Sequence, residues 1–213
     1  MNLQKIPVRK LARVFHVGTL NAQHKGRGGP SHEGNGLSVS LHPNEWSDIA
    51  RLGGETFTLT RSGGAFLDFR KLSESQLAEL EAWGAQNGWL TKVTLWRFDY
   101  IDSETEDERY MFCNTLAEAE GEAEDRTENG YDDEGHKLTE VTIPALSDKA
   151  RERIGFKQDD IFALDMAAAF LVEDCTELDG VWWNDRLDPG FLSAPRGVIV
   201  LSRLPSWTVA SGN

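Results

Sequence analysis

Short blocks of alternating apolar and polar side chains dominate the first third of the chain. Residues 10–20 read as a strand that ends in a Gly-Thr turn, and 37–41 (LSVSL) alternates apolar and hydroxyl side chains, as in a strand with one buried face. Strands are also predicted over 55–61 and 65–69. The Ser62-Gly63-Gly64 segment between them favours a hairpin turn.

Helical periodicity follows in two longer segments. Ser73 and Gln76 form a capping box, which predicts a helix over 74–87. A second helix is predicted over 159–173, where the side chains are apolar except for Asp165 and the two ends. Its composition predicts burial on most sides.

The remaining strands lie in the second half of the chain. A strand pair is predicted over 91–102 and 109–114, and a further strand over 138–143. The segments 179–183 (DGVWW) and 197–201 (GVIVL) are expected to pair with each other. This mixture of short strands and a few helices predicts the α+β class.

Length and composition narrow the class of protein. The 213 residues fit one domain spanning 1–213, and no low-complexity linker divides the sequence. No apolar run reaches the roughly 18 residues that a membrane span needs. Basic residues near the N-terminus are not followed by the apolar segment of a signal peptide. We therefore expect a cytoplasmic protein with no membrane partner, and two cysteines fit a reducing compartment.

Residues 21–36 are rich in glycine and contain almost no apolar side chains. This composition predicts a flexible loop. A loop of this length is uncommon inside a compact domain unless it is functional or disordered. We therefore regard it as a candidate substrate lid.

The net charge of −13 is concentrated in one segment. Residues 103–135 hold 13 acidic side chains against Arg109 and Arg126, and the rest of the chain is nearly neutral. Such a segment is either a solvated loop and helix face or a surface that binds a partner. The second interpretation gives an alternative function, a non-enzymatic acidic protein that mimics nucleic acid or inhibits a basic partner.

Short motifs near both ends of the chain carry a resemblance. The opening has Phe15-His16-Val17-Gly18-Thr19, a loop, and then Ser38-Val39-Ser40; the closing part has a helix, then DGVWWND and RGVIVL. In this order they resemble the ADP-ribosyltransferase fold, whose small members include phage-encoded anti-CRISPR enzymes and modules of bacterial toxins. The resemblance covers residues 13–52 and 159–204. It implies a split, mainly antiparallel sheet with packed helices, and NAD as a substrate.

The family resemblance also implies roles for the opening residues. In that family a histidine at this place bonds an NAD ribose and the adjoining turn holds the nicotinamide amide, so His16, Gly18 and Thr19 become NAD-binding candidates. A neutral imidazole is sufficient for such a hydrogen bond. The alternative for His16 is a hydrogen-bonded histidine of the core.

Three more side chains are candidates for NAD contacts. Ser38 and Ser40 share one face of their strand, because side chains two residues apart point the same way. They either contact NAD or fix the strand. Trp46 either stacks on the nicotinamide ring or belongs to the core, since its spacing with the next apolar residues is helical.

Breaking the bond between nicotinamide and ribose creates positive charge on the ribose. A carboxylate close to that centre stabilises the transition state. Asp185, after the DGVWW strand, is the first candidate for this acid, and Asp179 is the second. Asn-Asp pairs are also common in turns, which is the alternative for Asp185.

Together the motifs predict an NAD-dependent mono-ADP-ribosyltransferase that modifies a protein or nucleic-acid acceptor. The resemblance implies a setting of toxin or phage–host conflict, in which an inhibitor or antitoxin partner is expected. The alternative is the acidic interaction protein described above.

Overall fold

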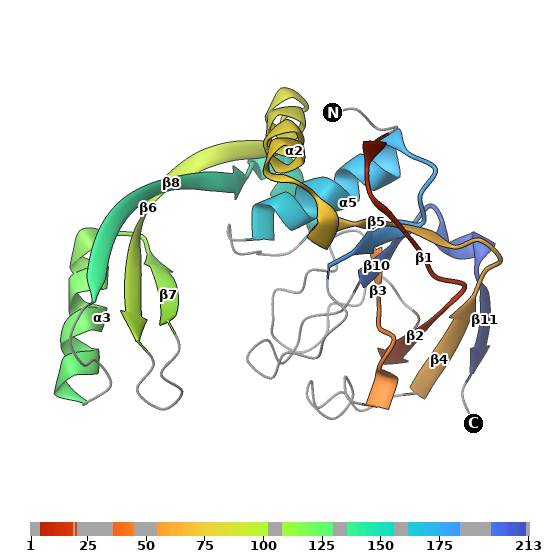
Figure 1. Ribbon diagram of the computed structural model, residues 1–213, viewed down its shortest axis with the longest axis horizontal. Coiled ribbons are helices and arrows are strands. Elements are labelled where there is room, and N and C mark those ends of the chain that lie inside the picture. The colour runs from red at the N-terminus through yellow and green to blue at the C-terminus, as the bar shows by residue number, and fades with distance from the viewer. Residues whose placement is uncertain are drawn as a thin grey trace. The chain divides into compact units, whose positions relative to one another are not determined.

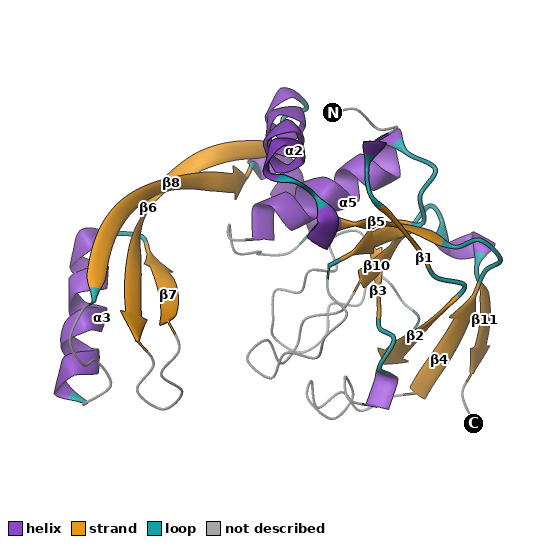
Figure 2. Ribbon diagram, viewed as in Figure 1, coloured by secondary structure: helices purple, strands orange, loops and turns teal. Residues whose placement is uncertain are grey.

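The computed structural model describes residues 5–18, 20, 36–44, 55–101, 108–129, 136–155, 162–183 and 197–211. These residues form a mixed α+β structure with mostly antiparallel sheets, which confirms the predicted class (Figures 1 and 2). None of the described helices is long and apolar enough to cross a membrane.

The chain groups into two compact units, whereas the sequence predicted one domain over 1–213. Unit 1 comprises Met1–Leu90 and Leu146–Asn213, and unit 2 comprises Thr91–Ala145. Both boundaries fall inside strands, β6 (Leu90–Ile101) and β8 (Lys137–Leu146). Because the boundaries between the units lie inside strands, no linker-like composition marks them in the sequence.

Unit 1 contains a five-stranded sheet, called sheet A here. Three of its four strand pairs are antiparallel, and the pair formed by its second and third strands is parallel. In spatial order its strands are β1 (Val8–Lys10), β5 (Ala65–Asp68), β9 (Gly180–Trp182), β10 (Gly197–Val200) and β3 (Gly36–Val39). The predicted pairing of the DGVWW and GVIVL strands is confirmed.

A second sheet of unit 1, called sheet B here, has three antiparallel strands. In spatial order they are β11 (Thr208–Ser211), β4 (Glu55–Thr60) and β2 (Arg13–Gly18). The predicted hairpin between β4 and β5 is wrong, because these strands belong to different sheets. The chain changes sheet at Gly64, where a Cβ atom would lie 2.2 Å from the Leu11 carbonyl oxygen. The absence of a side chain permits this corner between the sheets.

Two apolar cores lie on the two faces of sheet A. One core joins Leu67, Val181 and Val198 to the helices. The other lies between the sheets and contains Val14, Leu59 and neighbouring side chains of both sheets. Every residue of β3 is buried, so the prediction of one buried face for 37–41 is wrong. Gly36, predicted as the end of the flexible loop, is the first residue of β3.

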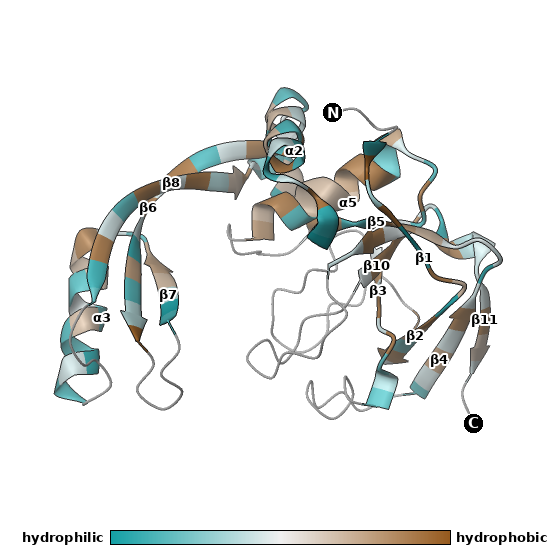
Figure 3. Ribbon diagram, in the orientation of Figure 1, coloured by the Kyte–Doolittle hydropathy of each residue, from teal (hydrophilic) through white to brown (hydrophobic). Residues whose placement is uncertain are grey.

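The helices of unit 1 begin at serine caps or in apolar surroundings. Ser73 caps α2 (Glu74–Gln86) with the predicted capping box, and Ser147 caps α4 (Asp148–Ile154). The long apolar helix is α5 (Ala163–Cys175), whose hydrophobic character is visible in Figure 3. It starts later than predicted, and Asp159 lies outside the described residues.

Unit 2 has a three-stranded sheet in the order β7 (Glu108–Cys113), β6, β8, with α3 (Leu116–Glu128). The β6–β7 pair confirms the predicted strand pair. For the acidic segment 103–135, the sequence analysis predicted a solvated loop and helix face or a partner-binding surface, and it gave no bounds for a helix. Thr115 and Glu118 form a capping box at the start of α3, a sequence signal that identifies the helix.

Candidate functional site

His16 lies at the rim of the core between the two sheets. It is 6% exposed, and its Nδ1 is 2.8 Å from the Ser38 carbonyl oxygen. A carbonyl oxygen can only accept, so Nδ1 carries the proton. In the neutral ring, Nε2 is then the acceptor. Phe57, its partner in β4, stacks beside the imidazole with 6.4 Å between ring centroids.

The turn after His16 borders this ring nitrogen. Gly18 has a φ of 123°, a backbone conformation that L side chains rarely adopt. A Cβ atom on Gly18 would lie 3.7 Å from Nε2 of His16. Gly18 therefore places bare backbone next to Nε2, while Thr19 lies outside the described residues.

Ser38 and Ser40 are buried at 2% and 1% exposure. The hydroxyl of Ser40 accepts a hydrogen bond from the backbone N–H of His42 at 3.0 Å. The backbone of Ser40 also forms a bridge with Phe15 on β2, with N–O distances of 2.8 and 2.9 Å. These bonds hold β3 beside the His16 strand, which agrees with the strand-fixing alternative for Ser40.

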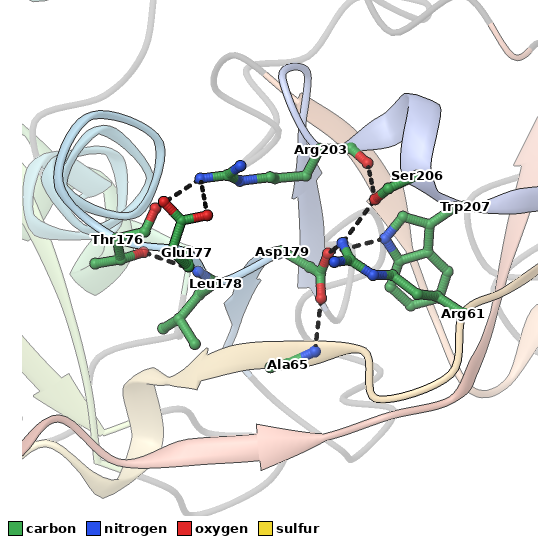
Figure 4. A network of polar contacts seen from close by, with 9 residues as sticks. All are labelled: Arg61, Ala65, Thr176, Glu177, Leu178, Asp179, Arg203, Ser206 and Trp207. Carbon is green, nitrogen blue, oxygen red and sulfur yellow. Dashed lines mark hydrogen bonds and ion pairs between the residues drawn. The ribbon is translucent and has the colours of Figure 1, made fainter.

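Asp179 is the centre of a polar network in unit 1 (Figure 4). The carboxylate is 1% exposed and forms an ion pair with Arg61. It also accepts the Ala65 backbone N–H at 2.7 Å and the Trp207 indole N–H at 3.3 Å. Three donors thus surround the carboxylate of Asp179, the pattern of a structural anchor.

The neighbouring pair of Arg203 and Glu177 is more exposed. Arg203 donates to the Thr176 carbonyl oxygen at 2.8 Å and lies 3.1 Å from a Glu177 carboxylate oxygen (Figure 4). The side chain of Glu177 is 94% exposed. This carboxylate contributes little to stability, as exposed pairs generally do.

The structure does not bring His16 and Asp179 together. His16 pairs with Phe57 in β4, whereas Asp179 binds Arg61, which follows the end of the same strand. Four residues of extended chain correspond to about 13 Å. The contacts of His16 and of Asp179 therefore involve different residues of the segment that runs through β4, and no described contact joins the two side chains.

The other end of β9 leads toward the first catalytic candidate. Trp182 lies opposite Gly197 of β10, and Gly197 lies opposite Val39 of β3. The C-terminal end of β9 therefore lies at the same end of sheet A as Val39, the last residue of β3. Asp185, two residues beyond Trp183, lies outside the described residues, as does Trp46.

One titratable group was not singled out as a site by the sequence. Asp165 is partly buried in the first turn of α5, among the apolar side chains of that helix. Burial raises its pKa from 3.8 to about 7, and the hydrogen bond of its own backbone N–H opposes this shift. The sequence signal was a single acid inside an apolar run.

Cys113 on β7 behaves as a buried apolar side chain. Burial raises the pKa of its thiol, and the carboxylates of Glu122 and Glu118 raise it further. The thiolate that a nucleophile requires is disfavoured.

Comparison of the chain with protein-family models, curated proteins and solved structures found no match.

Proposed function

We propose that this protein is an NAD-dependent mono-ADP-ribosyltransferase that modifies a macromolecular acceptor. The observation that carries the proposal is the fixed imidazole of His16. Its Nδ1 donates to the Ser38 carbonyl, so Nε2 is oriented as an acceptor next to the backbone of Gly18. An acceptor at this position suits the hydroxyl of a ribose.

The arrangement of the sheets also supports the proposal. The two sheets of unit 1 lie on either side of one core, and almost all of their strand pairs are antiparallel. This agrees with the split sheet that the family resemblance implies. We assign the ADP-ribosyltransferase-like fold to unit 1 as part of the proposal.

In the proposed reaction NAD binds beside β2 with its ribose hydroxyl on Nε2 of His16. As the nicotinamide leaves, positive charge grows on the ribose, and a carboxylate stabilises it. Asp185 is our candidate, because it follows the DGVWW segment in the sequence, as the family resemblance implies for the acidic residue. Asp179 is the weaker candidate, since three donors already occupy its carboxylate.

The proposal predicts loss of NAD cleavage when either side chain is removed. We expect His16→Ala and Asp185→Ala each to lower the rate of nicotinamide release by about 100-fold or more, within the range for loss of one electrostatic contact. His16→Asn is the sharper variant, because its amide can still donate to the Ser38 carbonyl but has no atom at the position of Nε2. Nicotinamide release is measured by chromatography, and labelled NAD with mass spectrometry identifies the acceptor.

His42 supplies a matched control. It is exposed and lies two residues beyond Ser40, outside the residues that we assign to NAD. His42→Ala should keep nicotinamide release within about twofold of the parent protein, as expected of a surface substitution. Full activity in both His16→Asn and Asp185→Ala refutes the site assignment.

Helix α3 favours a second candidate function, the acidic interaction protein. Six acidic side chains and one arginine lie within its thirteen residues. Glu120, Glu124 and Glu128 line a groove of about 550 Å³ together with His136 and Leu138. A groove of this charge suits a cationic partner.

NAD distinguishes the two candidate functions. A ligand that binds only the folded state stabilises it by about 2.7 kcal/mol at a hundredfold excess over its dissociation constant. The transferase should therefore melt at a higher temperature with NAD, whereas a pure interaction protein should show no shift. A triple variant removes the charges of the groove: Glu120→Gln, Glu124→Gln, Glu128→Gln. Under the first function this variant should keep NAD cleavage. Under the second function it should lose binding of a polylysine probe.

A further inference from the structure

The pairing of β2 with β4 places a further carboxylate beside His16 (Figure 1). His16 lies opposite Phe57 in the register of these strands, and Gly18 lies opposite Glu55. The imidazole of His16 and the ring of Phe57 stack on one face of the sheet. Side chains two residues apart on a strand share a face, so Glu55 points to the face that carries His16.

The register also makes Glu55 the diagonal neighbour of His16. Such neighbours lie about 7–8 Å apart across an antiparallel pair, within reach of long side chains. Directly opposite Glu55 is Gly18, which has no side chain. A Cβ atom on Gly18 would have Nε2 of His16 at 3.7 Å as its one described contact within 4 Å, apart from its chain neighbours. The bare backbone of Gly18 therefore leaves room between the imidazole and the carboxylate.

Glu55 differs from the apolar side chains of its own face. Val14 and Leu59 are buried in the core between the sheets, and Phe57 packs against that core, whereas Glu55 is exposed. Among the residues that the structure describes, no hydrogen bond or ion pair holds the carboxylate of Glu55. The face thus changes from apolar to polar at its rim, beside His16.

His16 and Glu55 have the same hydrogen-bonding chemistry. Nε2 of the neutral imidazole is an acceptor, and an ionised carboxylate can only accept. Two acceptors a few Å apart suit a ligand with two adjacent donors. A ribose presents such a pair in its 2′ and 3′ hydroxyls, and carboxylates bind ribose hydroxyls in dinucleotide-binding folds. A phosphate group is repelled by the carboxylate.

We propose that Glu55 binds the nicotinamide ribose of NAD, accepting one of its two hydroxyls while Nε2 of His16 accepts the other. This inference rests on the proposed function and adds a second ribose contact to it. Glu55 holds the ribose, and Asp185 keeps its proposed role at the bond that breaks. The site then selects a ribose on which both hydroxyls are present and unmodified.

The test is binding of a carbocyclic NAD analogue, which cannot be cleaved, measured by isothermal titration calorimetry. Glu55→Ala should raise its dissociation constant at least about tenfold, as for loss of a hydrogen bond to a charged group. Glu177→Ala is the matched control, since it removes an acid that is 94% exposed, and it should leave binding within about twofold. If Glu55 were only a solvated acid, its removal would leave binding of the anionic ligand unchanged or strengthen it.

A second variant moves the carboxylate without changing the net charge. In the Glu55→Thr, Thr56→Glu exchange the acid lies on the other face of β4. This variant should bind the analogue as weakly as Glu55→Ala does. Circular dichroism confirms that each variant is folded, and tight binding by the exchanged protein overturns the inference.

The 2′-deoxy and 3′-deoxy forms of the analogue identify the contact. One form should bind equally to the parent and to Glu55→Ala, because its contact with Glu55 is already missing, and the other form should bind equally to the parent and to His16→Asn. Unchanged binding by Glu55→Ala, or equal weakening of all three ligands, overturns the inference and leaves the proposed function intact. A parent protein that binds none of the analogues refutes both. The expected binding pattern without nicotinamide release from NAD refutes the transferase and keeps the ribose site.

Discussion

Replacing Asp179 with alanine is expected to lower the free energy of unfolding by about 2–6 kcal/mol, because two buried donors lose their acceptor at about 1–3 kcal/mol each. The carboxylate is almost fully buried and binds Arg61, the Ala65 N–H and the Trp207 indole. Alanine leaves all three donors without this acceptor. Two of them cannot turn to water, because the backbone and the buried indole are held in place.

Urea denaturation of the parent and variant proteins measures this effect. Glu177→Ala is the control, since it removes a carboxylate two residues away that is 94% exposed. Its effect should stay within about 0.5 kcal/mol, as for most surface substitutions. If Asp179→Ala keeps its stability and loses NAD cleavage instead, the carboxylate is a catalytic group and our structural interpretation of the network is wrong.

Replacing Asp165 with asparagine is expected to stabilise the protein at pH 8 and to have little effect near pH 4. Burial raises the pKa of this carboxyl from 3.8 to about 7 in the folded protein. Between these two values the unfolded chain is ionised at Asp165 while the folded chain keeps the proton. The folded state binds more protons there, so stability falls as the pH rises.

The loss is complete above pH 7, where the folded protein must also carry the buried charge. The raised pKa corresponds to a cost of a few kcal/mol for ionising Asp165 in the folded protein, since one pKa unit is worth about 1.4 kcal/mol. Asparagine cannot ionise and does not incur this cost. The difference in unfolding free energy between variant and parent should therefore grow from near zero at pH 4 to a few kcal/mol at pH 8, measured by urea denaturation at each pH.

Asp148→Asn is a control for this experiment. Asp148 occupies the first turn of α4 as Asp165 does in α5, but it is exposed. Its replacement should cost about 0.3–1 kcal/mol at neutral pH through the helix dipole, the opposite direction to Asp165→Asn. A constant difference between Asp165→Asn and the parent from pH 4 to pH 8 contradicts the raised pKa.

Local signals predicted the elements that local forces determine. The Ser73 capping box starts α2 where the sequence placed it, and the β6–β7 strand pair has the predicted partners. A second capping box, formed by Thr115 and Glu118, starts α3 inside the acidic segment, where the sequence analysis placed no helix bounds. Each of these signals depends on residues a few positions apart, which is why they can be recognised in a single sequence.

The candidate site was predictable only in part. The Phe15-His16-Val17-Gly18-Thr19 motif identified a histidine beside a glycine turn, and both are present in β2. The partner of His16 is the carbonyl of Ser38, 22 residues away, so the orientation of the imidazole depends on strand pairing. Arg61 as the partner of Asp179, 118 residues away, has no local signal at all.

Side-chain periodicity and short-range hydrogen bonds were enough to predict the α+β class, the capped helix α2 and the β6–β7 strand pair. Contacts between distant parts of the chain were needed to show that β4 and β5 enter different sheets at Gly64, that Asp179 anchors a network, and that 91–145 form a separate unit. These features depend on which distant surfaces bury one another. Many strand pairings are compatible with the same local alternation of apolar and polar residues. The close backbone approach at Gly64 permits the pairing that is observed.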